Sequence, residues 1–241
     1  MNSIMIWAHR GASGYAPENT LEAFQTAIEQ DADGIELDVH LSRDGEVMVA
    51  HDETVDRVSD GTGRIADMTV AELKKLVFSK TMPAFKEARI PTLREVFALM
   101  QPTRLSVNIE LKTNVFAYEG IEGKCIALIR EYGLQDRVIF SSFNHHSLLN
   151  VKRIDAKLPC GILYAGIMVR PWEYARALGF DALHPHYSEL AVPREVEDSH
   201  ACGIRVNVWT VNEEERLAQV IAKHPDGIIT NFPDRARRML S

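Results

Sequence analysis

The chain has 241 residues, 46% of them hydrophobic and 25% charged, a composition typical of a globular protein with a core of its own. Its formal net charge of −7 argues against binding along a nucleic acid backbone. Its three cysteines, Cys125, Cys160 and Cys202, are far apart and include no C-x-x-C pair, so neither a disulfide framework nor a thiolate zinc site is expected.

The distribution of apolar residues predicts no membrane anchor. No segment approaches the length of a membrane span, and the apolar run at 4–8 lacks the basic flank of a signal peptide. We therefore expect a cytoplasmic protein without a nucleic acid partner, and the sequence leaves its oligomeric state open.

The first two strands are predicted at 4–9 and 35–41, with a glycine-rich turn and a helix between them. We expect Asn19 to cap that helix, because Glu22 follows three residues later, as in a capping box. The Asp-Gly pair at 44–45, between two apolar runs, predicts a hairpin after the second strand.

The segment 52–89 interrupts this regular pattern. Thr69, ahead of the sequence VAELKKL, predicts a short capped helix within it, and the next core helix begins only near residue 92. We interpret 52–89 as an insertion rather than as a separate domain.

From residue 105 onward, short β-branched runs alternate with amphipathic stretches, which is the pattern of repeated βα units. The further strands are predicted at 106–112, 138–143, 160–165, 181–186, 205–211 and 227–231. Eight βα repeats in a chain of this length predict a (β/α)8 TIM barrel. It would span 1–241 as a single α/β domain, with the 52–89 insertion after the second strand and over the barrel mouth.

Acidic residues alternate with apolar residues in two of the predicted strands. Glu36 and Asp38 share one face of the second strand, and Glu110 and Lys112 share one face of the third. In a barrel the apolar face packs against the helices, so the three carboxylates would point inward. They form an all-oxygen ligand set suited to Mg²⁺ or Ca²⁺. The alternative is a structural ion network with Lys112 and Arg10.

Two histidines are predicted at the same rim of the barrel. His9 ends the first strand, and His51 ends the apolar run that follows the hairpin. Such a pair can share general acid and general base roles, although which residue would take which role stays open. His40 has the same parity as the acids, but we expect it to be a solvated histidine at a strand end.

Two cations accompany the predicted metal ligands. Arg10 follows His9 directly, and Lys112 ends the third strand. Together with a divalent cation they would suit an anionic substrate such as a phosphate ester.

Several motifs resemble those of the glycerophosphodiester phosphodiesterases, and they occur in the order found in that family. The likeness runs from about Ile6 to Asp234. The motifs are AHRGASGYAPENTLEAF, IELDVHLSRDGEVMVAHDETVDRVSDGTG, IPTLREV, NIELK, SSFN, VNVWTVN and ITNFPD.

The resemblance implies a TIM barrel with a small insertion, one divalent cation, and hydrolysis of glycerophosphodiesters to glycerol 3-phosphate and an alcohol. It implies an acid/base role for His9 and His51, and phosphate contacts for Arg10 and Lys112. Trp209 would line the glycerol pocket. The implied metal ligands are Glu36, Asp38 and Glu110.

The chain departs from the family pattern in two places. The stretch VFSKTMPAFKEAR replaces a small and aromatic segment, so Phe78, Phe85 or neither would cap the glycerol side. Asn231 stands where many relatives carry Asp, and we expect little consequence from this change.

Three questions stay open at the level of sequence. The nucleophile would be either water or the substrate's own 2-hydroxyl group, by way of a cyclic phosphate. The substrate could instead be a lysophospholipid, as in a lysophospholipase D. A catalytically silent barrel that only binds glycerophosphodiesters is the third reading, although a binder needs no acid/base pair.

Overall fold

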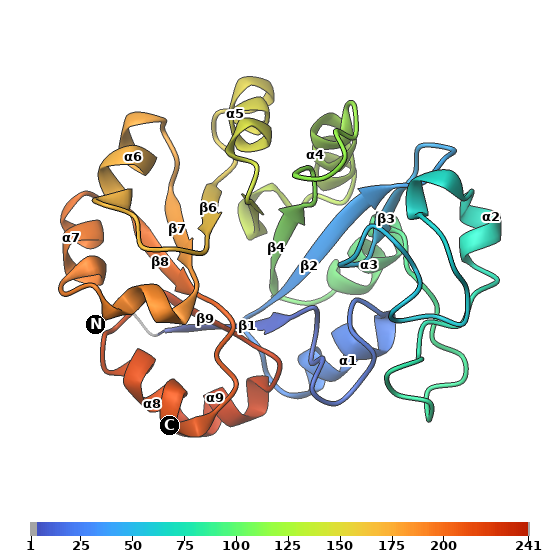
Figure 1. The fold of residues 1–241 in the computed structure, drawn as a ribbon, viewed down its shortest axis with the longest axis horizontal. Coiled ribbons are helices and arrows are strands. Elements are labelled where there is room, and N and C mark those ends of the chain that lie inside the picture. The colour runs from blue at the N-terminus through green and yellow to red at the C-terminus, as the bar shows by residue number, and fades with distance from the viewer. Residues whose placement is uncertain (1–3, 241) are drawn as a thin grey trace.

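A computed structural model describes residues 4–240 and shows a closed barrel of eight parallel strands surrounded by helices (Figure 1). The barrel closes because β1 pairs in parallel with both β2 and β9. The predicted TIM barrel is therefore confirmed. The barrel strands are β1 (Met5–His9), β2 (Gly34–Leu41), β4 (Ser106–Leu111), β5 (Val138–Ser142), β6 (Cys160–Tyr164), β7 (Ala182–Pro185), β8 (Arg205–Val208) and β9 (Gly227–Thr230).

Helices follow the strands and cover the outside of the barrel (Figure 1). Their apolar residues pack against the outward face of the strands, for example Phe24 of α1 and Phe97 of α3 in the same cluster as Leu37 of β2. The α-helices are α1 (Leu21–Glu29), α2 (Val70–Leu73), α3 (Leu93–Met100), α4 (Ile121–Glu131), α5 (His145–Ile154), α6 (Pro171–Ala177), α7 (Glu195–Ala201), α8 (Glu214–Ile221) and α9 (Pro233–Leu240). The 3₁₀ helices are η1 (Ile65–Asp67), η2 (Gln135–Arg137) and η3 (Tyr187–Ala191).

The predicted hairpin is formed by β2 and by β3 (Val47–Val49), which pair in antiparallel register. The short helix of the 52–89 segment is α2, and Thr69 and Glu72 form a complete capping box at its start, as expected. This segment lies beside the β2–β3 end of the barrel (Figure 1) and has a small hydrophobic cluster that includes Val55, Leu73 and Phe78.

The prediction that Asn19 caps the first helix is wrong. Helix α1 is capped by Thr20, whose hydroxyl accepts a hydrogen bond from the backbone N–H of Ala23. Asn19 has a left-handed backbone, with φ of 57°, and its side chain points instead toward β2. Its left-handed backbone sets the direction in which the chain enters the helix. Its side-chain amide contacts β2 and does not cap the helix.

Among residues 4–240, no helix combines the length and the apolar character that crossing a bilayer requires.

Candidate active site

A pocket opens where the barrel strands end, and most of the predicted site residues line it. His9, Arg10, Glu36, His51, Glu110 and Trp209 all contribute to its wall. The strands bring them together because the carboxyl ends of all eight meet at one face of a TIM barrel.

The three predicted metal ligands lie close together in the structure. Glu36, Asp38 and Glu110 are buried, and each offers a carboxylate oxygen within 4.8 Å of the others. Alternation along the strand explains this placement, since Leu37 packs outward in the core while its two neighbours point inward. The registers of β2 and β4 set Asp38 beside Glu110.

The electrostatics of this triad fit a cation. Burial and the neighbouring charge of Asp38 raise the pKa of Glu110 to about 7, and the same two causes raise the pKa of Glu36 well above its ordinary value. Burial also opposes ionisation of Asp38, but Arg10, His51 and Lys112 outweigh it and lower that pKa. Three clustered carboxylate groups of this kind have the oxygen chemistry of a Mg²⁺ or Ca²⁺ site.

Arg10 and Lys112 lie on opposite sides of Asp38, as the alternative ion network also requires. The Arg10 Nε atom is 3.6 Å from Asp38 Oδ2, and the Lys112 Nζ atom is 3.7 Å from Asp38 Oδ1. Lys112 also donates a 2.9 Å hydrogen bond to Glu110, while the backbone N–H of Arg10 donates one of 2.9 Å to Glu36. The raised pKa values of Glu36 and Glu110 show that these two cations do not fully stabilise three ionised carboxylates, which leaves room for a bound cation.

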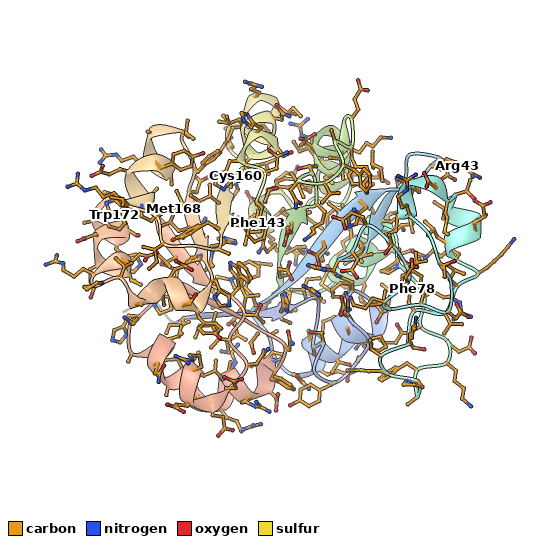
Figure 2. All side chains as sticks on the ribbon, viewed as in Figure 1. Arg43, Phe78, Phe143, Cys160, Met168 and Trp172 are labelled. Carbon is orange, nitrogen blue, oxygen red and sulfur yellow. The ribbon has the colours of Figure 1, made fainter. Side chains whose placement is uncertain are left out.

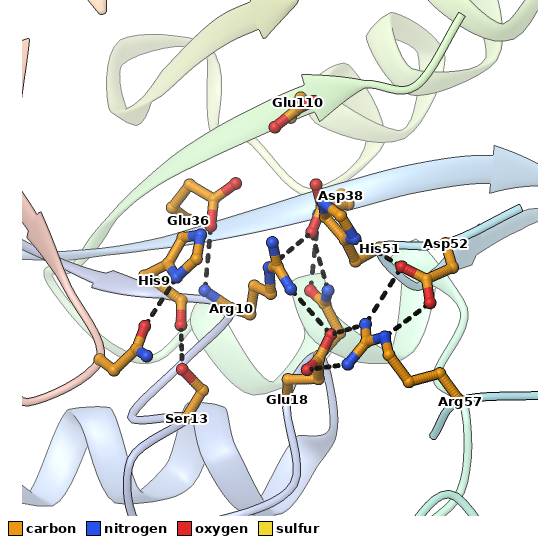
Figure 3. A network of polar contacts seen from close by, with 12 residues as sticks. His9, Arg10, Ser13, Glu18, Glu36, Asp38, His51, Asp52, Arg57 and Glu110 are labelled. Atoms are coloured by element: carbon orange, nitrogen blue, oxygen red, sulfur yellow. Dashed lines mark hydrogen bonds and ion pairs between the residues drawn. The ribbon is translucent and has the colours of Figure 1, made fainter. Parts of the chain in front are cut away.

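Both predicted histidines are oriented through their Nδ1 atoms (Figure 3). The Nδ1 atom of His9 is 2.7 Å from Asn231 Oδ1, and that of His51 is 2.7 Å from Asp52 Oδ1. Lys112 donates a hydrogen bond of 3.3 Å to the Nε2 atom of His51. With Nδ1 engaged as a donor in both rings, each Nε2 atom carries the lone pair.

The loop between β1 and α1 shapes this part of the site. Arg10 and Asn19 both have left-handed backbones, with φ of 54° and 57°, and the N–H of Asn19 donates to the carbonyl of Arg10 over 2.9 Å. The side chain of Asn19 then donates a 2.9 Å hydrogen bond to Asp38. Sequence reasoning missed this contact, because an Asn ahead of a helix is most simply interpreted as a cap.

One wall of the pocket is aromatic. Phe143 and Trp209 meet edge to face, with ring centroids 5.6 Å apart, and Trp209 is fixed by a hydrogen bond from its Nε1 to the carbonyl of His184. Phe143 follows β5 and lines the pocket near the centre of the view, whereas Phe78 lies toward α2 (Figure 2). Among residues 4–240, neither Phe78 nor Phe85 lines this pocket, and the sequence analysis had not singled out Phe143.

His40 is not the solvated residue that its place near a strand end suggested. It is fully buried, it accepts a hydrogen bond of 2.9 Å from Tyr118, and its Nε2 donates to the backbone carbonyl of His51 over 3.2 Å. Strand β3 pairs with β2 at His40, and the ring of Tyr118 packs edge to face on the imidazole, with ring centroids 5.4 Å apart, so no surface of His40 is left exposed. His40 therefore helps to fix the backbone of His51 through its Nε2 hydrogen bond.

The chain is similar to known proteins over nearly its whole length. Residues 9–235 match the family described as the Glycerophosphoryl diester phosphodiesterase family. The chain is 45% identical over 231 residues to a glycerophosphodiester phosphodiesterase from Caldanaerobacter subterraneus subsp. tengcongensis, covering 95% of each chain. It is 37% identical to one from Bacillus altitudinis, covering 96% of each.

Solved structures show the same relationship. A phosphodiesterase from Oleispira antarctica, solved in complex with the product sn-glycerol-3-phosphate, superposes with a TM-score of 0.92 at 30% identity, covering 98% of this chain and 96% of that one. A glycerophosphodiester phosphodiesterase from Thermotoga maritima gives a TM-score of 0.79 at 30% identity, covering 99% of each. The chain therefore belongs to the glycerophosphoryl diester phosphodiesterase family of enzymes.

Proposed function

We propose that the protein hydrolyses glycerophosphodiesters to sn-glycerol 3-phosphate and an alcohol, with one divalent cation and two histidines. The observation that carries this proposal is the composition of the pocket. Two imidazoles, each oriented through Nδ1, line the same cavity as Glu36 and Glu110, two members of the buried carboxylate triad. The product bound in the structure from Oleispira antarctica supports the choice of substrate.

Glu36, Asp38 and Glu110 would hold the cation, which we propose to be Mg²⁺ or Ca²⁺ because all three donors are carboxylate oxygens. When bound, the cation supplies positive charge to the phosphate oxygens on which charge develops. Arg10 and Lys112 add to that charge from opposite sides of Asp38. Because both side chains are largely enclosed, their attraction to a phosphate is weakly screened by water.

His9 and His51 would exchange protons with the substrate through their Nε2 atoms. Burial and the nearby charge of Arg10 lower the pKa of His9 to about 4, so this ring is neutral at pH 7 and its Nε2 can accept a proton. His51 donates a hydrogen bond from Nδ1 to the carboxylate of Asp52, which fixes the plane of the ring and leaves Nε2 as the atom that exchanges a proton. The two rings can thus serve the attacking and the leaving oxygen.

The aromatic wall would receive the glycerol carbons. Phe143 and Trp209 present an apolar surface beside the charged end of the pocket, so a substrate with a phosphate at one end and a small carbon skeleton at the other fits both parts.

An assay of product release tests the proposal. Glycerol 3-phosphate is measured with glycerophosphocholine and glycerophosphoethanolamine, in Mg²⁺, in Ca²⁺ and in excess chelator, and a lysophospholipid is included. We expect release that requires a divalent cation, is lost in His9→Ala and is unchanged in His146→Ala, an exposed histidine on α5.

Each contrary result would point elsewhere. Binding of glycerophosphodiesters without turnover would indicate a silent barrel. Turnover of the lysophospholipid alone would indicate a lysophospholipase D. Activity that survives His9→Ala would contradict the two-histidine mechanism, and activity in excess chelator would contradict the cation.

A further inference from the structure

Arg57, in the 52–89 segment, joins two carboxylates that come from different parts of the chain. Its Nη1 and Nη2 atoms donate to both oxygens of Glu18, over 2.8 and 2.7 Å. Its Nε and Nη2 atoms donate to both oxygens of Asp52, over 2.7 and 3.1 Å. One guanidinium thus makes two bidentate pairs, which fix its plane and the planes of both carboxylates.

Each of these carboxylates holds one group of the proposed active site (Figure 3). Glu18 accepts a 3.0 Å hydrogen bond from Nη1 of Arg10, and Asp52 accepts the 2.7 Å bond from Nδ1 of His51. Arg57 is therefore one carboxylate away from a proposed phosphate contact and one carboxylate away from a proposed acid/base residue.

Further contacts connect Arg10 back to His51, so that the hydrogen bonds and ion pairs form a closed cycle. Arg10 lies beside one oxygen of Asp38, and Lys112 joins the other oxygen of Asp38 to Nε2 of His51. We call this closed series the polar ring. Its members, in order, are Asp38, Arg10, Glu18, Arg57, Asp52, His51 and Lys112.

Arg57 is the most exposed member of the polar ring. Its side chain is 43% exposed and it does not line the cavity, whereas Arg10 and His51 do. It comes from the segment that was predicted to be an insertion over the barrel mouth, and Glu18 comes from the loop between β1 and α1. Within the polar ring, the contact between the 52–89 segment and the β1–α1 loop is therefore the ion pair of Arg57 with Glu18.

We propose that Arg57 is a positioning residue that fixes Arg10 and His51 relative to each other across the site. The 52–89 segment, which carries Arg57, then belongs to the active site of a single domain. This inference rests on the proposed roles of Arg10 and His51. Without Arg57, Glu18 is left with Arg10 as its ion-pair partner within the ring, and Asp52 can rotate away from the His51 ring. A shift of about 1 Å in a catalytic group can reduce a rate by roughly a hundredfold.

The two bidentate pairs of Arg57 should have separable effects on catalysis. We call the contacts through Asp52 the His51 arm and those through Glu18 the Arg10 arm. Asp52→Asn disturbs the His51 arm and should lower kcat, because the orientation of a proton-transferring ring is lost. Glu18→Gln disturbs the Arg10 arm and should mainly raise KM. Arg57→Gln should do both, with kcat/KM reduced roughly 10- to 100-fold, the range typical when an outer partner of a site residue is removed.

Arg43 offers a matched control for Arg57. It also ties the hairpin to the 52–89 segment, through a 3.0 Å ion pair with Glu72 and a hydrogen bond to the carbonyl of Asp67, and its side chain is 55% exposed. It lies next to α2 (Figure 2), and these contacts are with η1 and α2 and not with the polar ring. If Arg57 served only to attach the segment, Arg43→Gln would have a similar effect.

The experiment compares Arg57→Gln, Arg57→Lys, Asp52→Asn, Glu18→Gln and Arg43→Gln, together with the double variant Arg57→Gln/Asp52→Asn. We expect Arg57→Lys to fall between wild type and Arg57→Gln, since an ammonium cannot bridge two carboxylates in one plane. The double variant should have the kcat of Asp52→Asn alone, because both changes act through one ring. Arg43→Gln should keep the kcat and KM of wild type.

A second measurement does not depend on turnover. The Nδ1 proton of His51 should give a slowly exchanging imidazole NMR signal in wild type and Arg43→Gln, and this signal should be lost in Arg57→Gln and Asp52→Asn. A retained signal and an unchanged kcat in Arg57→Gln would overturn the proposal. So would equal losses in Arg43→Gln.

Failure of the mechanism itself would look different. If His51→Ala kept its full kcat, the acid/base role of His51 would be wrong, and the polar ring would then be judged on the NMR signal alone. If His51→Ala lost activity while Arg57→Gln did not, the mechanism would stand and the positioning role would be wrong.

Discussion

The imidazole of His9 donates its Nδ1 proton to the amide oxygen of Asn231, over 2.7 Å, and so joins the end of β1 to the end of β9. Asn231 is itself held in place, because its backbone N–H donates to the side chain of Asn212 over 2.9 Å. The residue at position 231 thus decides whether His9 faces a neutral amide or a charge, which is a larger consequence than the sequence analysis expected.

Replacing Asn231 by Asp should raise the pKa of His9 from about 4 toward the ordinary histidine range, since a carboxylate stabilises the protonated ring. An NMR titration of the His9 Cε1 proton measures this directly. Asn231→Ala provides the comparison, because it removes the hydrogen bond without adding a charge. An Asp variant that titrates like wild type would show that the amide does not control the ring.

Substrates with a better leaving group should distinguish the roles of the two histidines. A glycerophosphoryl ester of p-nitrophenol leaves as a weakly basic phenolate that needs no proton. The histidine that acts as general acid should therefore be far less important for this ester than for glycerophosphocholine, whereas the general base should be equally important for both. The ratio of the two rates in His9→Ala and in His51→Ala identifies the acid. Equal ratios in both variants would argue against a division of labour.

Binding of a divalent cation should compete with protons at the carboxylate triad. Because the pKa of Glu110 is raised to about 7 in the free protein, Glu110 is partly protonated at neutral pH and must lose this proton to act as a ligand. Calorimetric titrations with Mg²⁺ or Ca²⁺ at about pH 6 and about pH 8 should show tighter binding at pH 8. At pH 6, binding of the cation should release protons to the buffer. In Glu110→Gln both the affinity and the pH dependence should decrease. Proton-independent binding in wild type would contradict this coupling.

Acid should unfold the protein partly through His184. This ring is fully buried, and burial, with a smaller contribution from the charge of Arg205, lowers its pKa from 6.5 to about 3. Between these values the unfolded chain binds a proton that the folded chain does not, so the stabilisation is complete above pH 6.5 and is lost as the pH falls toward 3.

Urea unfolding across this range measures the effect. As the pH is lowered from 6.5 toward 3, the free energy of unfolding should decrease more steeply in wild type than in His184→Gln. The two slopes should differ by up to about 1.4 kcal/mol per pH unit. Gln can still accept the hydrogen bond that Asn207 donates to His184. His146→Gln, on the exposed surface of α5, should keep the wild-type slope. A slope in His184→Gln equal to that of wild type would exclude His184 as the source.

The barrel and the carboxylate triad could be predicted because both depend on short-range periodicity. Alternation along β2 fixes which face carries Glu36 and Asp38, and the parallel arrangement of strands brings Glu110 to the same end. None of this requires knowledge of how loops fold.

The polar ring could not be predicted in this way. Glu18 and Arg57 are 39 residues apart and meet only because the 52–89 segment folds against the β1–α1 loop. From residue type alone, each would be expected to be an ordinary charged residue at the surface. Phe143 was missed for a related reason, since a lone aromatic at a strand end is equally suited to a core, and only the position of Trp209 shows that it faces the pocket.

The left-handed backbones of Arg10 and Asn19 have a consequence for protein engineering. A non-glycine residue in this conformation costs roughly 1 kcal/mol, more for Arg than for Asn, so glycine at either position would relieve backbone strain. A selection for heat resistance alone would favour that replacement. Yet glycine at 10 removes a cation from the pocket, and glycine at 19 removes the hydrogen bond to Asp38. Variants recovered from such a selection should therefore be screened for activity at these two positions first, because there the most stable backbone and the working enzyme require different residues.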